Sequence, residues 1–252
     1  MAALLATGLV ACIDLTVDPK SIGAIEFVAP SMPSVIVGDT LRDSTGAPEQ
    51  LVAKVFTSDG DQVAGAPATF VSIDSLVTIV GGSFVVASAG VTGTSTLYAS
   101  VGSLQSAARQ LQVINRPDTV AAGTALQDTI LYFQPLTGTL DDSLTSVGVV
   151  VRDTAGAPVR AVLVSFRLVY RGVALAPADT GTYALLNDNS RPSRVDTTDA
   201  TGAASRRVRF RARAGVVTRD TIVVEASVKA LRQPLKGSPV SFTLLVLPRL
   251  TP

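Results

Sequence analysis

Short runs of β-branched and apolar residues recur along the chain, and turn-forming residues separate them at regular intervals. Val, Ile and Thr suit the pleated surface of a strand, whereas Gly, Pro and Asn-Asp pairs favour tight turns. Because no helical crossover separates the runs, successive strands are expected to fold back on one another as an all-β sandwich. The clearest predicted strands span residues 84–87, 94–101, 105–114, 183–186, 205–212, 218–228 and 240–247.

The chain also contains an internal repeat with an offset of 96 residues. Leu51–Phe70 aligns without a gap on Val147–Phe166, and each copy reads as an apolar strand, a polar turn and a returning strand. Gly60 aligns with Gly156, at a position where such a turn needs a positive φ. A β-sandwich domain has roughly 100 residues, so this offset in a 252-residue chain predicts two tandem sandwiches.

The boundary between the two sandwiches is predicted at Asn115–Asp118, directly after the last strand of the first copy. Pro117 lies in this segment, and a proline cannot donate a hydrogen bond to a strand ladder and stiffens the chain. The predicted organisation is a leader at 1–11, a tether at 12–21, and two immunoglobulin-like antiparallel β-sandwiches at 22–115 and 116–252.

Three segments of the second copy carry a recognisable pattern: VGVVVRDTAGAPVRAVLVSFRL, VDTTDATGAASRRVRFRARAG and DTIVVEASV. This pattern resembles the bacterial immunoglobulin-like domains of invasin and intimin adhesins. The matching turn and core positions are Asp153, Gly156, Pro158, Val159, Val164, Phe166, Thr198, Gly202 and Ala203. In the first copy, GTSTLYASVGSLQSAARQLQV resembles the end of the related second group of such domains. The resemblance implies a fold and a place in the cell envelope, and it carries over no catalytic residue.

The chain begins with the short apolar run MAALLATGLVAC, which ends at the single cysteine, Cys12. A membrane-spanning helix needs roughly 20 apolar residues, so this run is interpreted as a cleavable leader. Its end resembles the lipobox of bacterial lipoproteins, which implies cleavage before Cys12 and a lipid on its thiol. We therefore expect an exported, membrane-anchored lipoprotein at the outer membrane or cell surface. In the alternative interpretation, Leu4, Leu5, Leu9 and Val10 form a buried first strand or helix, and Cys12 is a small core residue.

The composition argues against catalysis. The chain has no His and no Trp, which removes the commonest general base and zinc ligand and the core Trp of antibody domains. A single Cys excludes an intrachain disulfide. With 21 basic and 20 acidic residues, the net charge of +1 creates no overall field toward nucleic acid or an anionic membrane. We expect no catalytic residue, no cofactor, no metal, no nucleic acid and no small-molecule substrate.

Arginines alternate with apolar residues between residues 206 and 213. On a strand, Val208, Phe210 and Ala212 would enter the core, and the arginines between them would share the outer face. This candidate anion-binding stripe comprises Arg207, Arg209, Arg211 and Arg213. Aligned guanidinium groups could bind phosphate, lipopolysaccharide or an acidic glycan. The interpretation we favour is a solvated face whose charges pair across strands with residues such as Asp220 and Glu225.

Two polar segments could in principle offer oxygen ligands to calcium. They are Asp196–Asp199 and Asn187–Asn189, and neither has the alternating spacing of a calcium loop. Asp and Asn more often close turns through their own backbone, so we expect turn caps here.

These features favour a non-catalytic structural or adhesion module of the cell envelope, acting as a spacer, a presenting scaffold or a subunit of a larger assembly. The alternative is a carbohydrate- or anionic-polymer-binding accessory lipoprotein that uses the arginine stripe or the loops at one end of a sandwich. An enzyme is a third class, which the missing acid–base residues disfavour. The expected partners are the membrane, through the lipid on Cys12, and an envelope protein or glycan.

Overall fold

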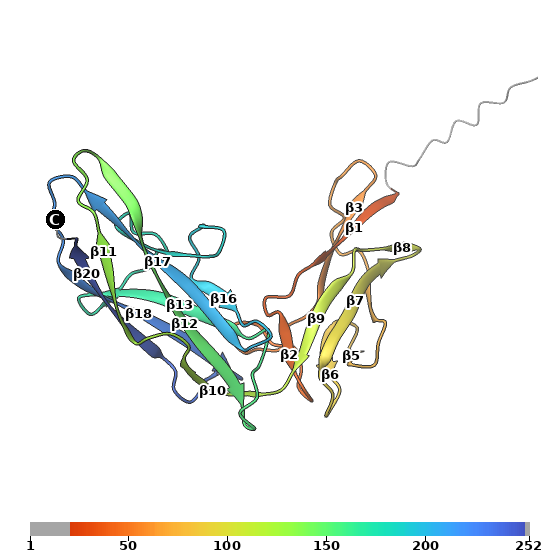
Figure 1. The fold of residues 1–252 in the computed structure, drawn as a ribbon. Helices are drawn as coiled ribbons and strands as arrows, with labels where there is room; N and C mark the ends of the chain where they lie inside the picture. The colour runs from red at the N-terminus through yellow and green to blue at the C-terminus, as the bar shows by residue number, and fades with distance from the viewer. Residues whose placement is uncertain (1–20, 250–252) are drawn as a thin grey trace, which may run out of the picture.

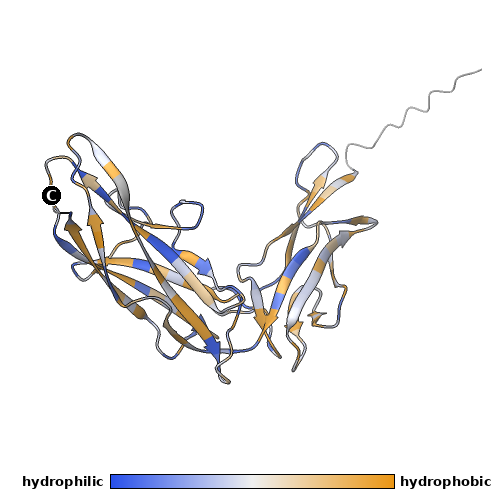
Figure 2. Cartoon of the chain, in the orientation of Figure 1, coloured by the Kyte–Doolittle hydropathy of each residue, from blue (hydrophilic) through white to orange (hydrophobic). Residues whose placement is uncertain are grey.

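The computed structural model describes residues 21–249, except for the side chains of residues 141–143, and its regular elements are all strands. The strands form two units that meet as an open V (Figure 1). Hydrophobic and hydrophilic residues alternate along many of the strands (Figure 2), as expected where one face of a sheet lies in a core. The prediction of an all-β chain with two immunoglobulin-like sandwiches is confirmed.

The first unit packs two layers of strands around a small apolar core. One layer pairs β1 (Ile22–Val28) with β3 (Val52–Thr57) and β5 (Val77–Val80) with β6 (Phe84–Ala87). The other has the order β2 (Ser34–Ile36), β9 (Arg109–Ile114), β7 (Gly93–Val101) and β4 (Thr69–Ser72), with β8 (Leu104–Gln105) paired to β7. Phe27 and Phe70 connect the layers, with ring centroids 5.4 Å apart.

The second unit has larger sheets and a larger core. One sheet has the order β10 (Pro117–Ala122), β12 (Thr139–Asp153), β17 (Ala203–Arg213) and β15 (Tyr183–Leu186). The other has the order β11 (Gln127–Tyr132), β20 (Val240–Pro248), β18 (Asp220–Ala230), β13 (Leu163–Tyr170) and β14 (Val173–Ala174). The short strands β16 (Val195–Thr197) and β19 (Gln233–Pro234) pair with β13 and β18. Phe166, Phe210 and Phe242 are wholly buried between the sheets.

Two strands run parallel to their neighbours, whereas the sandwiches were predicted to be antiparallel. They are β2, beside β9, and β11, beside β20. Each follows a strand, β1 or β10, that pairs antiparallel in the opposite layer. The chain therefore changes layers without reversing its direction, and both units do so in the same way. Hydrophobic alternation has the same period in parallel and antiparallel strands, so it does not predict this switch.

One turn structure recurs five times among the described residues. In each copy, the first residue donates its N–H to the carbonyl of the fifth, and the fourth N–H donates back to the first carbonyl. A side-chain oxygen of the first residue also accepts the N–H of the fifth. The first residues are Asp43, Thr57, Asp153, Asn187 and Asp199. The fourth residue has positive φ in every copy, which explains why it is glycine in all but Ser190.

The repeat found in the sequence places two of these capped turns 96 residues apart, at Thr57 and Asp153. The hydrogen bonds beside them are also equivalent: Val63 N–H donates to the Val55 carbonyl at 2.8 Å, and Val159 to Val151 at 3.0 Å. The returning strands nevertheless pair in the opposite layer, so each turn is a corner between sheets and not the start of a long hairpin.

The positions that carry the family resemblance have structural roles in this corner. The Thr198 hydroxyl donates to the Val159 carbonyl at 2.7 Å and accepts the Val162 N–H at 2.9 Å. Gly202 has a φ of +75° and packs against Val151, whose carbonyl oxygen would lie 2.5 Å from an added Cβ. These residues shape the fold of the second unit, as expected for a motif that specifies structure.

Gly202→Ala should therefore destabilise the second unit strongly. The positive φ costs about 1 kcal/mol in any non-glycine residue, and the clash with the Val151 carbonyl forces the backbone apart, for a total of about 3 kcal/mol or more. Gly172→Ala is the matched control, because Gly172 has a φ of +79° and open space around it. Urea unfolding monitored by tyrosine fluorescence measures both variants, since Tyr132, Tyr170 and Tyr183 lie in this unit. Equal losses in the two variants would contradict the packing argument.

Candidate functional site

The arginine stripe predicted from the sequence lies on β17. The inward side chains Val208, Phe210 and Ala212 are buried in the second core. Arg207, Arg209, Arg211 and Arg213 occupy the alternate positions, on the outer face of the sheet. The predicted direction of these side chains is thus the one observed.

Neighbouring loops engage two arginines of the stripe. Arg209 forms an ion pair with Asp179 at 2.9 Å, and Arg207 donates to the Ser190 hydroxyl at 2.8 Å and to the Asn187 carbonyl at 3.2 Å. The Gly181 N–H holds the pKa of Asp179 below its usual range, against the opposing effect of burial, and Arg209 lowers it further. Binding of an external anion by the stripe stays a prediction, and such an anion would compete with these internal contacts.

The ion-pair partners that the sequence suggested for the stripe are wrong. Asp220 and Glu225 lie on β18, in the opposite sheet. There Glu225 pairs with Arg167, and Asp220 accepts the Tyr170 hydroxyl at 2.8 Å. Sequence spacing does not show which sheet a strand joins, and this is the physical reason for the error.

Arg206 is a buried cation that the stripe did not include. Its side chain is almost fully buried, pairs with Asp196 at 3.0 Å and lies over the Phe166 ring at 5.9 Å. Arg206 lies two residues before Val208 on the strand, so its side chain points to the same, inward face of the sheet. This spacing is the sequence signal for its burial. Its partner Asp196 belongs to one of the two segments considered for calcium.

Those two segments act as turn caps, as predicted. Asp199 Oδ1 accepts the N–H groups of Thr201 and Ala203, and Asn187 Oδ1 accepts that of Arg191. Among the side chains that the structure describes, at residues 21–140 and 144–249, no group of three or more acidic or cysteine residues is arranged to hold a metal ion.

The two units meet at an elbow with a very short connection. Only Asn115 and Arg116 separate the end of β9 from Pro117, the first residue of β10. Pro117 was predicted to lie in the boundary segment, yet it already pairs with Asp153 in the second unit. The buried residues of the first core end at Val113, and those of the second begin at Ile114. The domain limits 22–115 and 116–252 stay predictions.

Direct contacts hold the elbow from both sides. The Ser34 hydroxyl donates to the Ala161 carbonyl at 2.7 Å, and the Asn115 amide donates to Asp153 Oδ2 at 2.9 Å. Ile114 is part of the second core, and Ile36 of the first unit packs against that core. The elbow therefore combines apolar burial with polar contacts across the two units.

Backbone strain gathers at the same place. Ala161, Leu231 and Arg232 have φ values of 58°, 49° and 72°, which few residues other than glycine adopt. Leu231 and Arg232 form the two-residue turn between β18 and β19. The turn packs so closely on Gly46 of the first unit that a Cβ there would lie 2.2 Å from the Arg232 side chain. Positive φ at both turn positions is what a two-residue hairpin turn requires, and the close approach of Arg232 to Gly46 shows that the turn fits tightly against the first unit.

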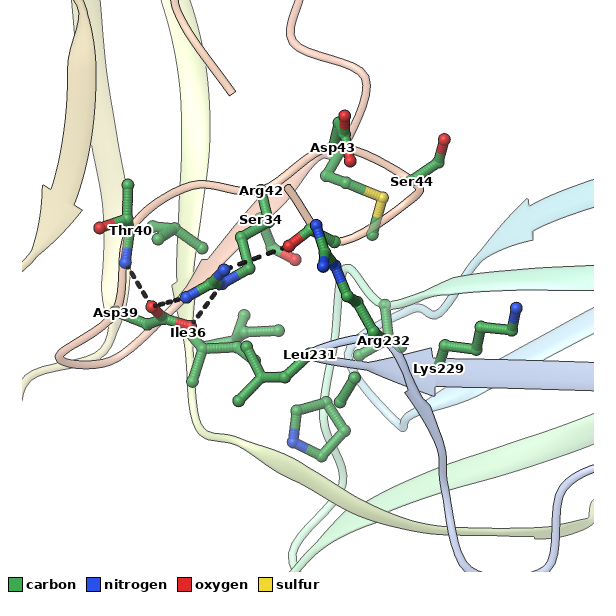
Figure 3. Close-up of a pocket in the computed structure, with 17 residues that line it drawn as sticks. Ser34, Ile36, Asp39, Thr40, Arg42, Asp43, Ser44, Lys229, Leu231 and Arg232 are labelled. Atoms are coloured by element: carbon green, nitrogen blue, oxygen red, sulfur yellow. Dashed lines mark hydrogen bonds and ion pairs between the residues drawn. The ribbon is translucent and has the colours of Figure 1, made fainter. Parts of the chain in front are cut away.

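A cavity of about 80 Å³ lies inside the elbow. Arg42 and Arg232 extend into it from the two units, and Asp39 accepts hydrogen bonds from Arg42 and from the Thr40 N–H (Figure 3). Arg42 pairs with Asp39 at 2.9 Å and also donates to the Gly46 carbonyl at 3.1 Å. A volume of this size holds a few water molecules and is far below that of a typical ligand pocket.

A larger, open groove of about 460 Å³ begins beside this cavity. Met32 and Ser44 contribute from the first unit, and β13 and β18 of the second unit form most of its floor. Its polar lining side chains are Ser44, Ser165, Ser227, Arg167, Arg194 and Lys229. The groove therefore combines these hydroxyl and cationic groups with the apolar side chains of Met32, Leu163 and Pro239.

Cys12, the predicted lipidation site, lies outside the described residues. Between residues 21 and 249, the structure contains no apolar helix of membrane-spanning length.

Comparison with known proteins assigns the chain to no family. No protein-family model matches the chain, and no curated protein matches its sequence. Similar solved structures include the surface layer protein SbsC, domains 1–6, at 13% identity and a TM-score of 0.32, and the adhesin InvE of Yersinia pseudotuberculosis, at 16% and 0.33. The Escherichia coli adhesin FdeC is 15% identical, with a TM-score of 0.30. These matches cover 93%, 90% and 89% of this chain but only 29%, 60% and 65% of the respective structures.

Acid unfolding should reveal the contact between Asp179 and Arg209. A lowered pKa contributes stability above the unfolded value of about 3.9, and this contribution is lost as the pH falls through the folded value. Asp179→Asn should therefore lose about 1 kcal/mol at pH 7 and show a smaller decline of unfolding free energy between about pH 4 and pH 2. Urea titrations at several pH values in this range measure how steeply the unfolding free energy falls with pH. Arg209→Gln should make this fall partly less steep. An unchanged slope in Asp179→Asn would show that the contact does not form in solution.

Proposed function

We propose that the chain is an exported, lipid-anchored and non-catalytic module of the bacterial cell envelope, in which two immunoglobulin-like sandwiches form a rigid bent scaffold. The elbow is the observation that carries this proposal. Two residues connect the units, and Ile36 and Ile114 of the first unit pack against the second core. Domains joined this closely resist independent motion. A spacer or presenting scaffold requires such a fixed arrangement of its domains.

The leader MAALLATGLVAC supports the anchoring part of the proposal. A diacylglyceryl group on Cys12, together with an acylated new amino terminus, would attach the protein firmly, because more than one chain is needed for stable anchoring. In this proposal, the described residues begin shortly after the anchor and stand at the outer membrane or cell surface.

The groove beside the elbow is the place where we propose that a partner binds. Ser165, Ser227 and Lys229 offer hydroxyl and ammonium groups beside Met32 of the first unit. A folded protein or an acidic glycan of the envelope matches this mixture of polar and apolar groups. Because both units contribute side chains to the groove, its shape depends on the fixed elbow.

Metabolic labelling tests the anchor directly. When the full chain is expressed in bacteria supplied with radioactive palmitate, the membrane fraction should contain a labelled protein of the expected size. Cys12→Ser should abolish the label, with an antibody to the chain controlling for expression. No label on the parent protein, or the same label on Cys12→Ser, would overturn lipid anchoring at this residue.

A further inference from the structure

The outer end of the second unit carries an exposed apolar surface. Two loops form it: residues 133–138, between β11 and β12, and residues 214–219, between β17 and β18. The surface, here named the distal tip, comprises Phe133, Leu136, Val216 and Val217, which are 47%, 99%, 52% and 65% exposed. Soluble proteins seldom expose several large apolar side chains together unless the surface meets a partner or a membrane.

Hydrogen bonds fix the loops beneath the distal tip. The Thr218 N–H donates to the Tyr132 hydroxyl at 2.6 Å, and that hydroxyl donates to the Thr218 carbonyl at 3.0 Å. The Ala214 N–H donates to the Gly138 carbonyl at 2.9 Å and joins the two loops. The two loops are therefore tied to each other and to Tyr132 of the second core, while the four apolar side chains stay exposed.

Three exposed arginines lie beside the loops of the distal tip. Arg213, Arg219 and Arg249 are exposed beside the loops, and Arg249 lies over the Phe133 ring at 4.3 Å. Neither loop contains Asp or Glu. The nearest acidic residues in the sequence are on the adjoining strands: Asp128, Asp141, Asp142 and Asp220. Of these, Asp220 is engaged by Tyr170 and by Arg171.

We propose that the distal tip binds the surface of an anionic lipid bilayer. Leu136, Val216 and Val217 would enter the region between the headgroups, while the three arginines contact lipid phosphates. A loop apex with a wholly exposed leucine is convex, so it enters a fluid interface without needing a preformed pocket. The combination of apolar apex and cationic rim is the chemical complement of anionic headgroups above hydrocarbon.

The shape of the molecule brings this tip and the start of the described chain to the same side. β1 begins at the outer end of the first unit, and the distal tip lies at the outer end of the second, both at the open side of the V (Figure 1). Cys12 precedes Ile22 by ten residues. A lipid on Cys12 would thus direct the tip toward the membrane that holds the anchor. This orientation rests on the proposed function, whereas the affinity of the tip for lipid does not.

Vesicle flotation with unlipidated protein tests the affinity of the distal tip for lipid separately from the proposed lipid anchor. The full chain carrying Cys12→Ser should float with vesicles of phosphatidylcholine containing 30% phosphatidylglycerol and stay in the dense fraction with phosphatidylcholine alone. Added salt should weaken the binding, because it screens the arginines. Failure to bind the anionic vesicles at low salt would overturn the membrane proposal, and palmitate labelling of the parent chain is unaffected by that result.

Matched variants assign the binding to the distal tip. Leu136→Ser and Val217→Ser should each lower the partition coefficient about tenfold, and Arg213→Gln and Arg219→Gln about fivefold each. Ile73→Ser is the control, because Ile73 is 66% exposed in the first unit, away from the tip. It should leave binding unchanged, and circular dichroism should show that all variants fold. An equal loss of vesicle binding in Ile73→Ser and Val217→Ser would overturn the proposal. So would the finding that the distal tip binds a protein from an envelope extract but does not bind lipid.

Discussion

The carboxylate of Asp153 connects the second core to the elbow. Its Oδ1 accepts the N–H groups of Ala155 and Ala157 and closes the corner between β12 and β13, while Oδ2 accepts the amide of Asn115 in the connection. Burial acts to raise the pKa of Asp153, but the hydrogen bonds from Ala157 and Asn115 outweigh it and hold the pKa below its usual range. One ionised side chain therefore bonds both to the corner where the chain changes sheets and to the connection between the two units.

The same capped turn explains other corners of the structure. Asp43 closes another copy of this turn in the first unit, and that turn also contains Gly46, against which Arg232 packs. The elbow is thus assembled from turns that each sandwich needs for its own fold. A mutation in either turn should consequently change the relation between the units as well as the stability of one of them.

Much of this architecture could be predicted, because strands with one buried face alternate regularly. The predicted strands at 84–87 and 183–186 coincide with β6 and β15, and the arginines of β17 face outward as expected. Alternation does not record the partner of a strand, so the parallel pairing of β2 and β11 and the partners of the arginines were not predictable from it. The elbow groove and the distal tip could not be predicted from the sequence either, because each consists of segments that are far apart along the chain.

Both the groove and the direction of the distal tip depend on a fixed elbow. Pulsed electron resonance between spin labels measures it most directly, in a Cys12→Ser protein carrying Asp59→Cys and Thr221→Cys at exposed positions of the two units. We predict one narrow distance distribution, which broadens when Ile114→Ser removes an apolar contact of the joint. A broad distribution in the protein without Ile114→Ser would show that the units move independently and would contradict a fixed elbow.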